Sequence, residues 1–284
     1  MDSVKMVLQI CGNSIRKSLY KPRIYLAFLM VAFLMLDFSD KLKTFSQLVD
    51  VPVSPWVLPF FAGNTGNQIF IVLGALLIFC DAPFLNPNSY MQIVRCGRKR
   101  WFWGTMLYIW VQSMIYAAGL FLLSVALLLP RVRFMTGWGK VLGTLTQTAA
   151  GSVVSMRQLD YYVIAEFTPL QALFLVLTVI CLNGVLVGVL NYALNLWIKN
   201  GSGTIASALL VLSPLLLTKL VPEEIAHYFA PPVWMDLTLC SWNGYGDYAS
   251  PLYIYLCLFF LVGAFVVISY VGIRRKDLSV VEEL

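Results

Sequence analysis

The chain has 284 residues, of which 60% are apolar and only 12% are charged. A soluble domain carries about 25% charged residues, so a chain with half that share and a mean hydropathy of +0.79 cannot cover a surface that faces water. The composition therefore predicts an integral membrane protein and excludes a soluble enzyme. The net charge of +6 then indicates membrane orientation, not nucleic-acid binding.

Residues 3–20 are predicted to form a short amphipathic helix. Apolar side chains such as Val7 and Cys11 recur at helical spacing, and Lys5 and Arg16 lie on other faces. A helix with this pattern and basic flanks favours the membrane interface, with a helix that binds a soluble partner as the alternative. The segment lacks the apolar run and cleavage site of a secretory signal peptide.

Six apolar segments follow, each close to the length of about 20 residues that a spanning helix needs. Their inner stretches contain no Asp, Glu, Lys, Arg or His. We therefore expect an all-α membrane protein with one transmembrane domain over 1–284. The predicted spans cover about 20–38, 56–80, 104–129, 170–198, 204–221 and 251–273. The first is the shortest apolar run, and the second contains a polar stretch.

Charge predicts the orientation of these spans. With the N-terminus in the cytoplasm, the inner segments hold 13 of the 20 Lys and Arg residues but only 5 of the 14 acidic residues. Basic residues favour the cytoplasmic side, so both termini are expected there. The two outer loops, 130–169 and 222–250, are long enough to be functional elements. The second is rich in aromatic residues and is expected to lie on or dip into the outer interface.

Catalytic motifs are absent from the sequence. There is no phosphate-binding loop, and the single histidine, His227, cannot form a metal site with Glu224 alone. We therefore expect no catalytic residues, no metal site and no enzymatic activity. The lack of charged residues inside the spans also disfavours an ion-driven carrier, because such carriers keep ionisable relay groups in the membrane. Energy for any transport would come from another protein.

Uncharged polar residues interrupt two of the spans. Amides in hydrocarbon need hydrogen-bond partners or a water-filled cavity. In the second span they favour a translocation path, with packing between helices as the alternative. The candidate path residues are Phe61, Asn64, Asn67 and Gln68. In the fourth span, Asn183, Asn191 and Asn195 lie near one face with the small pair Gly184 and Gly188, a pattern typical of close helix packing.

The inner segment 81–103 is predicted to contain a second short helix. Pro83 and Pro87 break the preceding span, Asn88 or Ser89 can cap a helix, and Gly97 can end it. Four basic residues then face the inner leaflet: Arg95, Arg98, Lys99 and Arg100. An ordinary basic loop would explain the charges but not a capped helix between prolines.

This organisation resembles the permease subunit of a bacterial type-2 ATP-binding-cassette (ABC) exporter. The similar runs are Asp81-Ala82-Pro83-Phe84, Arg95-x-Gly97-Arg98-x-x-Trp101 and the outer run from Trp138 to Leu145. The resemblance implies a multi-pass protein of the bacterial cytoplasmic membrane that dimerises with an identical or paralogous permease. It also implies a separate cytoplasmic ABC ATPase that binds ATP and Mg²⁺, no cofactor on this chain, and contacts with membrane lipids but not nucleic acid.

In that family the short inner helix couples the permease to the ATPase. The resemblance assigns this role to Asn88, Ser89, Tyr90, Met91, Ile93 and Arg95. The family subgroup includes exporters of phenol-soluble modulins and other antimicrobial peptides, and other relatives export lipids or polysaccharides. An alternative function is a membrane immunity or scaffold protein that sequesters a toxic peptide without transport.

Overall fold

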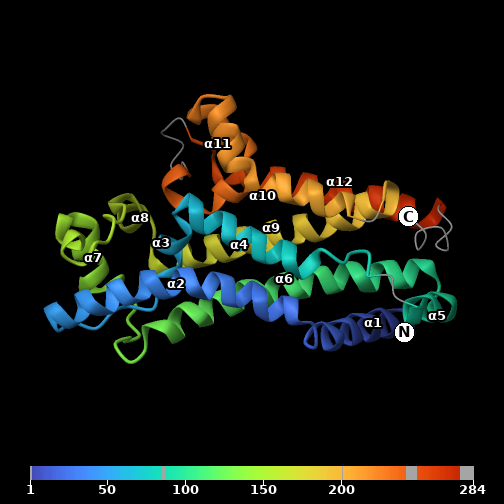
Figure 1. The fold of residues 1–284 in the computed structure, drawn as a ribbon, viewed down its shortest axis with the longest axis horizontal. Helices are drawn as coiled ribbons and strands as arrows, with labels where there is room; N and C mark the ends of the chain where they lie inside the picture. Colours follow the sequence, from blue (N-terminus) through green and yellow to red (C-terminus); the bar gives the residue numbers. More distant parts are fainter. Residues whose placement is uncertain (1, 85–86, 200, 241–247, 276–284) are drawn as a thin grey trace.

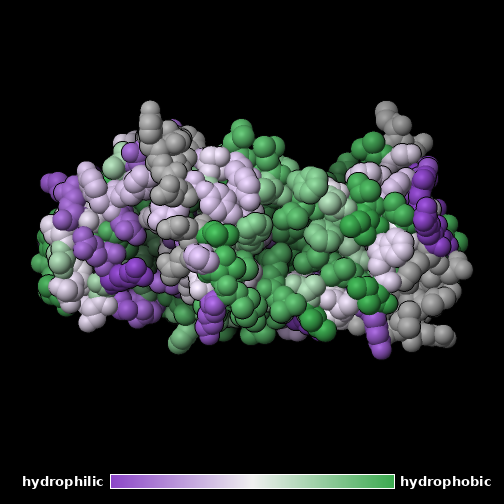
Figure 2. Space-filling view, turned by 90° about the horizontal axis from the view of Figure 1, so that it is seen from above, coloured by the Kyte–Doolittle hydropathy of each residue, from purple (hydrophilic) through white to green (hydrophobic). Residues whose placement is uncertain are grey.

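A computed structural model describes residues 2–84, 87–199, 201–240 and 248–275 (Figure 1). These residues form helices and connecting segments, with two isolated β-bridges and no strand among them. The long helices lie side by side along the longest axis of the molecule (Figure 1). In Figure 2 a broad hydrophobic band crosses the middle of the visible face, and hydrophilic residues gather toward both ends. An all-α, multi-pass membrane protein is thus confirmed.

Five helices in the described part of the chain are long and apolar enough to cross a membrane. They are α2 (Pro22–Val49), α6 (Arg98–Leu128), α9 (Pro169–Trp197), α10 (Ser202–Leu220) and α12 (Pro251–Arg275). The helix α9 is apolar on all sides and mostly buried, and it packs against α6, α10 and α12. A helix without a polar face belongs in the middle of a bundle, so α9 is the central helix.

The first spanning helix extends beyond its apolar part. The predicted span ended at residue 38, but α2 continues to Val49. Ion pairs between side chains one turn apart support this charged continuation: Lys41 with Asp37 at 2.7 Å and Lys43 with Asp40 at 2.6 Å. The helix ends at Asp50, which has a left-handed conformation with a φ of 51°.

The second predicted span, 56–80, is broken in the structure. It consists of the short α3 (Leu58–Ala62) and α4 (Thr65–Phe79). With 15 residues, α4 is about 22 Å long at 1.5 Å per residue, and the hydrocarbon core is about 30 Å thick. The sixth crossing therefore stays a prediction.

A segment of the second outer loop packs beside the broken span. The 3₁₀-helix η2 (Pro231–Met235) is buried and contacts α4, α9 and α10. Irregular backbone at membrane depth is tolerated only where protein surrounds it or a cavity hydrates it. The buried segment η2 is surrounded by protein, and whether this loop dips into the outer interface stays a prediction.

Short helices occupy both ends of the bundle. The helix α1 (Asp2–Ser18) and the helix α5 (Pro87–Cys96) both pack against α6, at the end of the bundle where α12 finishes (Figure 1). The opposite end carries α7 (Gly139–Gln147) and α8 (Tyr161–Glu166) (Figure 1). The remaining short elements are η1 (Ala149–Val154), α11 (Glu223–Phe229) and η3 (Leu237–Leu239). We call the end with α1 and α5 the basic end.

Candidate functional site

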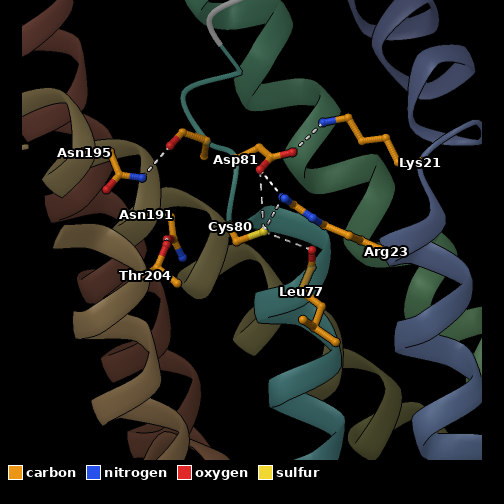
Figure 3. A network of polar contacts seen from close by, with 9 residues as sticks. Lys21, Arg23, Leu77, Cys80, Asp81, Asn191, Asn195 and Thr204 are labelled. Carbon is orange, nitrogen blue, oxygen red and sulfur yellow. Dashed lines mark hydrogen bonds and ion pairs between the residues drawn. The ribbon is translucent and has the colours of Figure 1, made fainter. Parts of the chain in front are cut away.

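A cluster of polar contacts ties the basic end of the bundle together (Figure 3). At the start of α2, Lys21 pairs with the Asp81 carboxylate at 3.0 Å and Arg23 pairs with the same carboxylate. The Arg23 guanidinium also donates to the Cys80 sulfur at 3.1 Å. Because Asp81 directly follows Cys80, the residue that caps the end of α4, these contacts join the start of α2 to the end of α4. We call Lys21, Arg23, Cys80 and Asp81 the Asp81 cluster.

The charge state of this cluster is set by its two cations. Burial acts to raise the pKa of Asp81, but hydrogen bonds and attraction from Lys21 and Arg23 outweigh it and hold the pKa below its ordinary value. Asp81 is therefore ionised at neutral pH. The Asp81 side chain is 39% exposed, so solvent screens its ion pairs with Lys21 and Arg23. These pairs therefore contribute little to the stability of the fold and act mainly to hold α2 beside the end of α4.

A buried amide extends the connection to two further helices. The Asn195 side chain of α9 is 4% exposed and donates to the Ala82 carbonyl at 2.6 Å (Figure 3). Its oxygen accepts from the backbone N–H groups of Gly201 and Gly203, at 3.1 and 2.8 Å. One side chain thus holds the segment after α4, the end of α9 and the start of α10.

The other amides of α9 also bond within the chain. Asn191 donates to the Ser207 hydroxyl of α10 at 2.7 Å, and Asn183 donates to the Pro231 carbonyl of η2 at 3.1 Å. A Cβ atom added at Gly188 would lie 2.6 Å from Ile109 of α6, so that glycine permits close approach of α6 and α9. These contacts favour the packing interpretation for α9.

The helix α5 extends from this tied segment. Ile93 is buried, with 6% exposed, and faces the body of the protein, whereas Met91 and Val94 are 67% and 82% exposed. Arg95 is also exposed, and Gly97, with a φ of 82°, separates α5 from α6. A short helix thus presents two apolar side chains and a cation beyond the end of the bundle.

The structure changes one detail of the predicted coupling helix. The helix begins at Pro87, so Asn88 and Ser89 lie in its first turn and neither is the cap. Proline suits the first helical position because that residue needs no N–H donor. The side chains of Asn88, Ser89 and Tyr90 lie outside the described part of the chain.

The predicted path residues surround the break between α3 and α4. Asn64 is exposed and accepts from the Gly66 N–H at 2.8 Å, which caps α4. Asn67, half-buried, donates to the Phe61 carbonyl at 2.8 Å, and the buried Gln68 donates to the Ala62 carbonyl at 2.8 Å. The amides therefore satisfy carbonyl groups that the break frees from helical bonding. The buried Phe61 packs against Phe38 of α2. A role in a path stays a prediction.

Sequence reasoning missed a buried carboxyl group beside this break. Asp236 is 8% exposed, and a Cβ atom added at Gly63 would lie 3.6 Å from its Oδ1. Burial raises the pKa of Asp236 to about 6, although two hydrogen bonds from Thr238 act in the opposite direction. The signal in the sequence was an acidic residue within the apolar run from Val233 to Leu237.

Within the described residues, no three His, Cys, Asp or Glu side chains are grouped as metal ligands would be. No protein-family model matches the chain, and no curated protein or solved structure matches it. The described residues define a helical membrane protein with five long apolar helices, a broken shorter segment and a short helix with exposed apolar side chains at its basic end.

Proposed function

We propose that this chain is the membrane permease subunit of an ATP-driven bacterial exporter. It works as a dimer, with an identical or paralogous permease, and with separate cytoplasmic ABC ATPases that bind ATP and Mg²⁺. Its cargo is an amphipathic or antimicrobial peptide. The observation that carries the proposal is α5, which presents exposed apolar side chains, packs against α6 and follows the segment that holds Asp81 and Ala82.

The apolar side chains of α5 support a docking role. Met91 and Val94 are exposed on a helix that also carries Arg95, and apolar side chains in water gain free energy when a partner covers them. A short amphipathic helix commonly binds by placing its apolar face in a groove of a partner. The proposed partner is the ATPase.

The contacts behind α5 provide a route for motion. A displacement of α5 would act on α6, which it contacts, and along the chain on the segment after α4, which the Asp81 cluster joins to α2 and which Asn195 joins to α9 and α10. Movement of the ATPase would thus reach α4 and the break at Asn64, where half-buried and exposed amides lie near η2.

The test is a charge placed on the exposed side of α5. Val94→Asp should weaken binding of the co-expressed ABC ATPase by about 30-fold, because burying an unpaired carboxylate costs at least about 2 kcal/mol. Co-purification of the two proteins and peptide-stimulated ATP hydrolysis are the measurements. Val153→Asp is the matched control, since Val153 is equally apolar and 73% exposed on η1, and it should leave both unchanged.

Wild-type binding and hydrolysis in the Val94→Asp protein would contradict the proposal. The alternative, an immunity protein, has its own signature: cells expressing this chain without any ABC ATPase would still resist the toxic peptide. An exporter of lipid or polysaccharide would instead show hydrolysis stimulated by those cargoes and not by peptides.

A further inference from the structure

An open apolar groove lies between α6 and α12, with α1 at its edge. Its volume is about 510 Å³. One wall carries Trp103, Leu107 and Trp110 of α6, and the other carries Phe259, Gly263 and Val266 of α12. Both helices pack against α9, which leaves this space between them on the outside of the bundle.

The groove has room for a hydrocarbon chain. From Trp103 to Trp110 it extends for about 10 Å along α6, at 1.5 Å per residue. A Cβ atom added at Gly263 would meet no atom within 4 Å, so nothing in the protein fills the space beside it. Apolar walls within a membrane hold water poorly, and an acyl chain fits their chemistry.

Positive charge lies at one end of the groove. Arg100 is one helical turn before Trp103, and its Nη1 lies 3.9 Å from the Met6 sulfur, next to the groove residue Val7. On the other wall, the Arg274 guanidinium lies 4.8 Å from the centre of the Tyr270 ring, one turn after Val266.

Aromatic contacts connect the two charged walls. The centre of the Tyr270 ring of α12, one helical turn beyond the groove residue Val266, is 6.4 Å from that of Trp103 of α6. The acidic Asp81 at this end of the bundle is already paired with Lys21 and Arg23. A negatively charged headgroup at this end of the groove would therefore lie between Arg100 of α6 and Arg274 of α12. Its acyl chain could stay in the apolar groove at the same time.

We propose that this groove binds an anionic phospholipid, with one acyl chain between α6 and α12 and the phosphate headgroup between Arg100 and Arg274. Basic side chains at the membrane surface attract anionic headgroups, and the apolar walls of the groove hold the acyl chain. This site is separate from the exposed face of α5, so it does not depend on the proposed export function.

Quenching of tryptophan fluorescence by brominated lipids tests the site. The protein is placed in phosphatidylcholine vesicles that contain phosphatidylglycerol or phosphatidylcholine with brominated acyl chains. In wild type, we expect brominated phosphatidylglycerol to quench at about 30-fold lower mole fraction, because each of the two arginines at the headgroup contributes about fivefold. Trp110→Phe should weaken the quenching signal, because it deletes one of the two groove fluorophores, while the remaining Trp103 should still report the preference for phosphatidylglycerol.

Two substitutions distinguish the contribution of the acyl-chain contacts from that of the headgroup contacts. Gly263→Leu fills the groove and should abolish the preference, whereas Gly12→Leu, at another open helical glycine, should retain it. Arg274→Gln should reduce the preference without changing quenching by brominated phosphatidylcholine.

Equal quenching by the two lipids in wild type would overturn the proposal, as would equal loss of preference in Gly263→Leu and Gly12→Leu. A second copy of the chain is the competing occupant. Cross-linking of Gly263→Cys into a dimer in these vesicles would show that the groove is covered by protein, and would also overturn it.

Discussion

Asp81 and Asp236 both lie outside the predicted spans, but their surroundings shift the pKa of the two carboxyl groups in opposite directions. Two cations lower the pKa of the half-exposed Asp81, whereas burial raises that of Asp236 to about 6. Asp81 belongs to a run that the sequence had already singled out. The setting of Asp236 depends on η2 and Gly63 meeting in space, and no spacing in the sequence encodes that contact.

The raised pKa of Asp236 predicts a stability that falls as pH rises. Below the ordinary pKa of 3.8 both folded and unfolded chains hold the proton. Between 3.8 and about 6 only the unfolded chain releases it, so unfolding becomes more favourable, and above about 6 the loss is complete. The full loss is roughly 3 kcal/mol for a shift of this size.

Asp236→Asn should therefore unfold at a higher temperature than wild type at pH 7.5, and the difference should shrink at pH 4. Thermal unfolding in detergent across this range is the measurement. Thr238→Val removes a hydrogen bond that lowers the pKa of the carboxyl group, so the fall in stability should extend to higher pH than in wild type. Parallel pH curves for wild type and Asp236→Asn would show that the carboxyl group is not strained by burial.

At the scale of elements, the sequence predicts helices better than it predicts where they break. The observed α9, α10 and α12 lie within two residues of the predicted spans at each end, because hydropathy changes sharply there. The charged end of α2 was missed because helical hydrogen bonds continue past the apolar run. The break at Gly63 and Asn64 was missed because side-chain amides replace the helical bonds there.

Close packing of α6 on α9 predicts a large cost for enlarging Gly188. A Cβ atom there would lie 2.6 Å from Ile109 and 3.3 Å from the Phe79 ring of α4. Gly188→Ala should destabilise the protein by about 1–3 kcal/mol, the usual cost of overpacking, measured by thermal unfolding in detergent. Gly12→Ala meets open space and should be neutral or stabilising, since alanine favours helix. Equal unfolding temperatures for both variants would contradict the packing.

At the scale of the whole molecule, the sequence predicted an all-α membrane protein with several spans from composition and hydropathy. The residues at the α3–α4 break and those of α5 were each predicted as one group, because each group is contiguous in the sequence. The connection from Asp81 to Lys21, and from Ala82 to Asn195, joins residues 60 and 113 positions apart. Only the fold brings these together, so they were not predicted as a unit.

The last prediction concerns whether the short α4 crosses the membrane. If it does, the end of α2 and the helix α5 lie on opposite sides, because only the α3–α4 segment lies between them. Leu48 and Met91 mark the two positions, with side chains that are 64% and 67% exposed. Each is replaced by cysteine in a chain whose six native cysteines are changed to alanine.

A membrane-impermeant maleimide should label Leu48→Cys in intact cells and Met91→Cys only after permeabilisation. The expected direction follows from charge, because Arg95 and Arg100 favour the cytoplasmic side. Phe134→Cys, 71% exposed beyond the far end of α6, is the control and should label like Leu48→Cys. Labelling of Leu48→Cys and Met91→Cys from the same side would mean that α4 enters and leaves the membrane on one face. The protein would then have five crossings, and its two ends would lie on opposite sides of the membrane.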